Sequence, residues 1–111
     1  MSRERLPNRR QAETVALEHG GMNFEVTVGF YPDGRPGEVF THGAKAGSTM
    51  DGLLDDACIV VSRLLQHGVT AADLVGSMGR LGNAEPASVI GAVIDLVAST
   101  ALGPALDEVL A

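Results

Sequence analysis

The sequence has one cysteine, Cys58, no tryptophan, and only three phenylalanines and one tyrosine among 111 residues. A single cysteine excludes an internal disulfide framework and is typical of a reducing setting, so we expect a cytoplasmic protein. Because aromatic residues are scarce, the core has to come from aliphatic side chains, which the 45% hydrophobic content can supply. This length suits one hydrophobic core and therefore one domain.

Long hydrophobic runs are also missing. The longest aliphatic stretch, 89–102, is interrupted by Asp95 and is shorter than the roughly 18 apolar residues of a membrane span. The first residues, MSRERLPNRRQAE, are charged and lack the apolar segment of a signal peptide. We therefore expect no membrane partner.

Basic residues are few and unevenly placed. Half of the 8 Lys and Arg residues precede residue 11, whereas all but one of the 14 Asp and Glu residues follow it. We expect residues 1–10 to form a basic, flexible tail and residues 11–111 to form one acidic domain. Because nucleic acid binding depends on Lys and Arg contacts to phosphates, nucleic acid is not an expected partner of the domain. The alternative for the tail is contact with an acidic partner.

The first part of the domain has period two. Phe24, Val26, Val28 and Phe30 alternate with polar residues, which predicts a half-buried antiparallel strand over 23–30. Weaker alternation predicts strands over 13–19 and 38–42. Gly20-Gly21 and the Tyr31–Pro36 segment supply the turns between them.

From Ser48 the period becomes 3.6. A helix is predicted from Ser48 or Thr49 to Gly68, and its apolar stripe comprises Leu53, Leu54, Ala57, Val60, Val61, Leu64 and Leu65. Thr70 caps a second helix over 71–78. A third helix is predicted over 87–99, ended by Gly103-Pro104, with 105–110 adding a final turn. The predicted fold is α+β, a three-stranded antiparallel meander followed by three to four helices packed on one face.

Several segments together resemble the TSCPD domain, a domain found in ribonucleotide reductases. They are the Val26-Thr27-Val28 strand, the run Asp33-Gly34-Arg35-Pro36-Gly37-Glu38-Val39-Phe40, the Gly43–Gly47 loop and the helix containing Leu53-Leu54 and Val61–Leu65. The resemblance covers roughly residues 21–97. It implies a standalone member of that family, related to deoxyribonucleotide synthesis by association.

The chain departs from the family after Arg80. The family's Thr-Ser-Cys-Pro-Asp segment corresponds to residues 82–88, GNAEPAS, which keep a proline but have no cysteine. Tetrahedral zinc needs about four Cys or His ligands, which one cysteine and three scattered histidines do not supply. We expect no metal and no cofactor.

Two functions are compatible with these residues. The first is a non-catalytic accessory or interaction domain with a ribonucleotide reductase subunit as its partner. The second is a small nucleotide- or anion-binding module that uses Lys45, Gly47, Ser48 and Thr49, because glycines permit close backbone approach and a helix N-terminus favours an anion. The simpler interpretation of this loop is a plain connection between strand and helix.

No residue pattern indicates a catalytic site, so we expect no catalytic activity of its own. Cys58 lies mid-helix without a histidine at an activating spacing, which indicates a buried small hydrophobe rather than a reactive thiol. None of the three histidines belongs to a recognisable nucleophile pattern. Small residues on the third helix, Gly91, Ala92 and Ala98, would also allow close packing in a homodimer.

Overall fold

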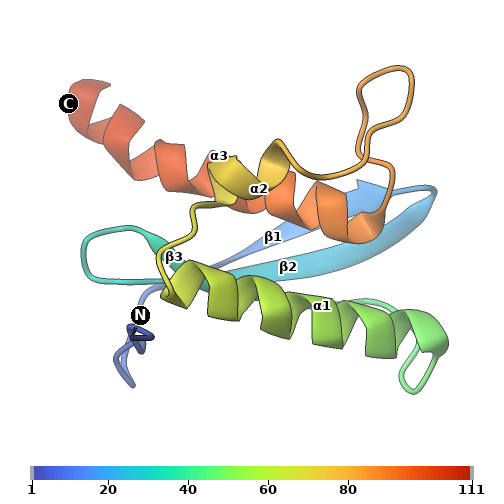
Figure 1. Ribbon diagram of the computed structural model, residues 1–111, viewed down its shortest axis with the longest axis horizontal. Coiled ribbons are helices and arrows are strands. Elements are labelled where there is room, and N and C mark those ends of the chain that lie inside the picture. Colours follow the sequence, from blue (N-terminus) through green and yellow to red (C-terminus); the bar gives the residue numbers. More distant parts are fainter. Residues whose placement is uncertain (1, 111) are drawn as a thin grey trace.

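Three strands are followed by three helices, which confirms the predicted α+β order (Figure 1). The structure, a computed structural model, describes residues 2–110, and of residues 101–110 the backbone only. The elements are β1 (Ala12–His19), β2 (Met22–Phe30), β3 (Pro36–His42), α1 (Thr49–Gln66), α2 (Ala71–Val75) and α3 (Val89–Leu110). No helix in the described part of the chain is long and apolar enough to cross a bilayer.

The strands form an antiparallel sheet in the order β1-β2-β3, as a meander requires. Gly20 and Gly21 close the first hairpin with positive φ angles of 59° and 80°, a conformation that glycine adopts at low cost. The register places Val26 opposite Val15 and Thr41, and Val28 opposite Val39. Alternate residues of β2 therefore point to one face, which the helices cover.

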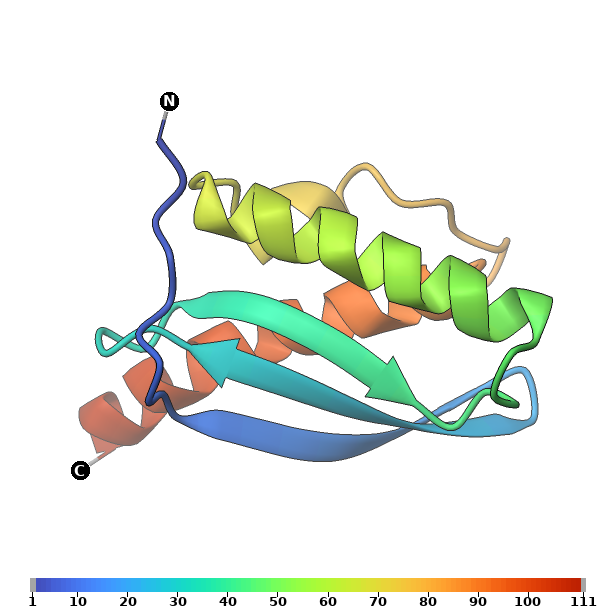
Figure 2. The same ribbon diagram turned by 90° about the horizontal axis from the view of Figure 1, so that it is seen from below.

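The core lies between that face and the two long helices. It is aliphatic, as the composition predicts, and its most buried members are Val26, Val28, Val93, Ile94 and Val97. Helices α1 and α3 run in the same direction, with both N-termini at the end of the β1–β2 turn (Figures 1 and 2). Figure 2 shows α1 alongside β3, the strand at the edge of the sheet.

The apolar stripe of α1 is narrower than predicted. Only Leu54, Cys58, Val61 and Leu65 of that helix join the apolar core. Leu53 and Val60, which were expected to face inward, remain 64% and 58% exposed. The prediction was wrong here because α1 packs against one edge of a small sheet, so a single row of side chains, at spacings of 4, 3 and 4, suffices to contact it.

The ends of the later helices also differ from expectation. Helix α2 ends at Val75 rather than Met78. Helix α3 begins at Val89, since the Ser88 hydroxyl accepts a hydrogen bond from the Gly91 N–H at 3.1 Å and so caps the helix. It continues to Leu110, and the prediction that Gly103-Pro104 ends it was wrong. Proline has a helix-compatible φ and removes only one donor, so a helix can pass through it at a cost.

Candidate functional site

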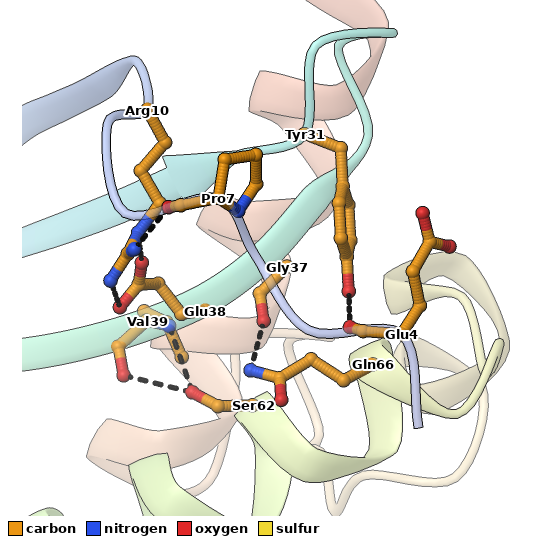
Figure 3. A network of polar contacts seen from close by, with 9 residues as sticks. All are labelled: Glu4, Pro7, Arg10, Tyr31, Gly37, Glu38, Val39, Ser62 and Gln66. Carbon is orange, nitrogen blue, oxygen red and sulfur yellow. Dashed lines mark hydrogen bonds and ion pairs between the residues drawn. The ribbon is translucent and has the colours of Figure 1, made fainter. Parts of the chain in front are cut away.

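The N-terminal segment crosses the end of α1 and the β2–β3 turn (Figure 3). The Glu4 N–H donates to the Gln66 carbonyl at 2.8 Å, and the Tyr31 hydroxyl donates to the Glu4 carbonyl. The Arg3 guanidinium donates to the Gln66 side-chain oxygen. Residues 3 and 4 thus have specific partners in the domain, while the flexibility expected for residues 1–10 stays a prediction.

Arg35 of the β2–β3 turn lies at the centre of the neighbouring charges. Its guanidinium contacts Asp33 Oδ2 at 2.7 Å and Glu4 Oε1 at 2.9 Å, and stacks 4.6 Å from the centre of the Tyr31 ring. The Arg35 backbone N–H and then its guanidinium hold the pKa of Asp33 below its usual range. These carboxylates and the guanidinium are about half exposed, so each ion pair contributes little stability by itself. The arrangement fixes the turn, because one guanidinium pairs with both carboxylates.

A row of polar side chains on α1 closes the outer edge of β3. The Ser62 hydroxyl accepts from the Val39 N–H at 2.9 Å and donates to the Val39 carbonyl at 3.2 Å. The Gln66 side-chain amide, one helical turn later, donates to the Gly37 carbonyl at 2.8 Å (Figure 3). Unpaired backbone groups on an edge strand otherwise favour pairing with another chain. This row, which we call the Ser62–Gln66 row, therefore joins helix to sheet through backbone groups.

Cys58 lies one turn before Ser62 on the same row. Burial raises the pKa of its thiol, and hydrogen bonding with Thr41 acts more weakly in the opposite direction. The side chain is 2% exposed, which confirms the expectation of a buried small residue. A protonated, buried thiol is a poor nucleophile and a poor metal ligand.

An open cavity of about 430 Å³ lies outside the Ser62–Gln66 row. Its charged lining residues are Arg3, Glu38, Asp55 and Arg63. Glu38 is already paired with the Arg10 guanidinium. The cavity is lined by charges of both signs, so its walls do not define the charge of a ligand.

The loop of Lys45 forms a capped helix start. The Ser48 hydroxyl accepts from the Asp51 N–H at 3.1 Å, and Asp51 Oδ2 accepts from the Gly47 N–H at 3.1 Å. Gly47 has a positive φ of 76°, and Lys45 is exposed. The structure therefore brings Lys45, Gly47, Ser48 and Thr49 to one helix end. An anion there would share that end with the carboxylate of Asp51.

In the part of the chain that the structure describes, no group of three or more His, Cys, Asp or Glu side chains is placed to hold a metal ion. His42 packs edge-on against Phe40 at 6.0 Å between ring centres, on the sheet face away from the helices. His42 pairs with Glu25 across the sheet, and His19 pairs with Met22, so these two histidines are not neighbours.

Sequence reasoning missed the Ser62–Gln66 row. Its signal was present, because Ser62 and Gln66 are polar residues four apart, a spacing that places them on one side of a helix. The predicted apolar stripe of this helix leaves both residues out, and periodicity does not reveal which polar side of a helix meets the edge of a sheet. Figure 3 shows both residues pointing at β3.

An apolar groove of about 550 Å³ lies on the other side of α1. It separates the N-terminal halves of α1 and α3 and ends at the β1–β2 turn. Met22, Met50, Leu53 and Ile90 are among its lining residues, and the first three are 42%, 38% and 64% exposed.

These features define a class of protein: a small α+β module whose buried polar groups join its own elements and which carries an apolar groove beside α1. Residues 2–107 match the TSCPD domain family, and the chain belongs to this family.

The relatives are large reductases. The chain is 46% identical over 67 residues to the vitamin B12-dependent ribonucleotide reductase of Rhodopirellula baltica, a match that covers 60% of this chain and 6% of that protein. It is 43% identical over 67 residues to the enzyme of the same name from Streptantibioticus cattleyicolor, covering 60% and 11%. For Agrobacterium fabrum the match is 37% over 73 residues, covering 66% and 6%. The chain thus matches only a small part of the length of these relatives. No solved structure matches the chain.

Proposed function

We propose that the protein is a non-catalytic accessory domain that binds a ribonucleotide reductase in the cytoplasm. The observation that carries the proposal is its likeness to a short segment of vitamin B12-dependent ribonucleotide reductases, with 46% identity in one of them. The matched segment makes up only 6% of that enzyme, so what the enzyme shares with this chain is one small module of it.

The structure offers surfaces for such binding. The groove beside α1 exposes large apolar side chains, a feature typical of surfaces that contact another protein. The excess of acidic over basic residues, a net charge of −6, favours a partner surface with lysines and arginines.

The test is retention of a reductase by this protein. The tagged full chain is incubated with lysate of the source cell, and bound proteins are identified by mass spectrometry. The purified reductase is then titrated against the immobilised chain, and its activity is measured with and without the chain. We expect saturable binding and an effect on reductase activity, with no turnover by the chain alone. If the purified reductase shows no saturable binding, the proposal is wrong.

The second candidate is binding of a nucleotide or anion at Lys45, favoured by its exposure beside a helix N-terminus. Its test is the melting temperature during titration with nucleoside di- and triphosphates. Binding at this place predicts a rise that Lys45→Ala abolishes and Asp51→Asn increases, since Asn removes the competing charge. Arg5→Ala, in the N-terminal segment, is the matched control. If no nucleotide raises the melting temperature, the candidate fails.

A further inference from the structure

Helix α1 has a second apolar row besides the one in the core. Met50, Leu53, Ala57, Val60 and Leu64 follow one another at spacings of 3, 4, 3 and 4, the pattern of the contact positions in a coiled coil. We call them the outer row. Met50, Leu53 and Val60 are 38%, 64% and 58% exposed, while Ala57 and Leu64 are half-buried.

The outer row lies about a quarter turn from the core row, on the side of the apolar groove. Met50, Leu53 and Ala57 form one wall of that groove. Three large aliphatic side chains exposed along one helix cost free energy in water, roughly 25 cal/mol for each Å² of apolar surface. A helix packed along the row would remove this cost.

Two opposite charges lie on one side of the outer row. Asp56 and Arg63 are seven residues apart, so they share one side of α1; both are exposed, and Arg63 also borders the cavity beside β3. Neither takes part in an ion pair within the described residues, whereas Arg10, Arg35 and Arg80 each do. Residues at this position beside the contact row of a coiled coil normally pair with charges on the partner helix.

The spacing of these charges fits a second copy of the same helix in antiparallel orientation. In this alignment Ala57 packs against Val60 of the second copy at the centre of the contact, so a small side chain faces a larger one. Towards each end, Leu53 packs against Leu64 of the second copy. The same alignment brings Asp56 beside Arg63 of the second copy, and symmetry repeats the pair. In a parallel alignment Asp56 would instead face Val61, which is buried in the core.

We propose that the protein forms a symmetric homodimer through antiparallel packing of the outer rows of two α1 helices. In such an interface the same surface of each copy contacts its counterpart on the other copy, so the assembly ends at two chains. It differs from the homodimer expected through α3, where Gly91 and Ala92 are buried within the domain. The proposal is independent of reductase binding.

Charge reversal tests the orientation as well as the contact. Sedimentation equilibrium of the full chain measures the dimer dissociation constant for the wild type, Asp56→Arg, Arg63→Asp and the double variant. Each single reversal turns two attractive pairs into two repulsive ones, and we expect dimerisation about tenfold weaker. The double variant restores opposite charges in both pairs and should return to the wild-type value.

Asp55→Arg is the matched control, because it makes the same change of charge one residue away, on the side of α1 opposite the outer row. It should leave the dissociation constant close to that of the wild type. Leu53→Asp places a charge in the outer row and should give a monomer with unchanged far-ultraviolet circular dichroism.

Three results would overturn the proposal. The first is a wild type that stays monomeric up to about 200 µM, well above ordinary protein–protein dissociation constants. The second is a dissociation constant for Asp56→Arg equal to that for Asp55→Arg. The third is a double variant whose dimerisation stays as weak as that of the single variants. If the wild type is monomeric and Leu53→Asp loses retention of the reductase, the outer row binds the reductase instead. In that case the second-copy proposal fails while the proposed function stands.

Discussion

Removing the Ser62 hydroxyl should destabilise the protein by opening the edge of the sheet. In Ser62→Ala the Val39 N–H and carbonyl lose the partners that lie 2.9 and 3.2 Å away. Ser62 is half-buried and no other described side chain bonds to Val39, so only water that enters between α1 and β3 can replace the hydroxyl.

The magnitude follows from two opposing terms. An unsatisfied, partly buried backbone donor costs about 1–3 kcal/mol. Alanine is a better helix former than serine, which returns roughly 0.5 kcal/mol. The net loss in the free energy of unfolding should be about 1 kcal/mol, which corresponds to about 4 °C in melting temperature for a domain of this length.

Urea unfolding followed by circular dichroism, at one fixed protein concentration, measures this loss. Ser99→Ala is the control, because Ser99 is an exposed helical residue whose hydroxyl bonds only to the Leu96 carbonyl of its own helix. It gains the same helix propensity without opening a sheet edge, and should be slightly stabilised. The reasoning is refuted if Ser62→Ala is as stable as Ser99→Ala.

Three further predictions concern backbone strain, an ion pair and the thiol. Gly43→Ala should cost more than about 1 kcal/mol, because Gly43 has a φ of 125° and a Cβ there would lie 2.7 Å from a backbone oxygen. Gly52→Ala, in α1 with open space, should stabilise by about 0.5–1 kcal/mol, and equal urea midpoints for the two variants would contradict this. The Arg80 guanidinium lowers the pKa of Asp95, so their pair stabilises the fold above the unfolded pKa of about 4 and is lost as pH falls through the folded value. The urea midpoint of Asp95→Asn should therefore fall less than that of the wild type on acidification, and parallel curves would rule this out. Burial of Cys58 should keep it nearly unreactive towards a thiol reagent at about pH 8 until urea unfolds the chain, and rapid native-state labelling would show that α1 opens locally.

The strands and the core were predictable because their signals are local. Period two over β2 and the Gly20-Gly21 turn determine both the hairpin and the face that is buried. In the predicted third helix, Val89, Val93, Ile94 and Val97 recur at helical spacing, and all four are buried. These features follow from the order of polar and apolar residues alone.

The limits of sequence reasoning were reached where two elements meet. The apolar pattern of α1 fits one wide stripe or two narrower rows equally well, and only the position of the sheet separates Leu54 from Leu53. The Lys45 loop was predicted to precede a helix, which it does, but the carboxylate of Asp51 at the same helix end depends on a rotamer that periodicity does not specify. Contacts of Arg3 and Glu4 with α1 join residues more than sixty positions apart, and no local pattern encodes them.

The residues that carry the family likeness have structural roles in this chain. Arg35 of the Asp-Gly-Arg-Pro turn binds Glu4 and Asp33, and Glu38 of the following strand binds Arg10. This motif therefore organises the turn and the N-terminal segment. Residues 82–88, where the chain lacks the cysteine expected from the resemblance, lie in a loop closed by the Arg80–Pro86 bridge.

The Ser62–Gln66 row gives the sheet two unequal sides. Along β3 the helix supplies hydrogen-bonding partners to the outward backbone groups of Gly37 and Val39, whereas β1 pairs only with β2 in the described part of the chain. An added strand could thus extend the sheet at β1 alone. When the β1 strands of two chains pair with each other, neither sheet has a free edge left for another strand. Backbone pairing between chains of this protein is therefore limited to two sheets.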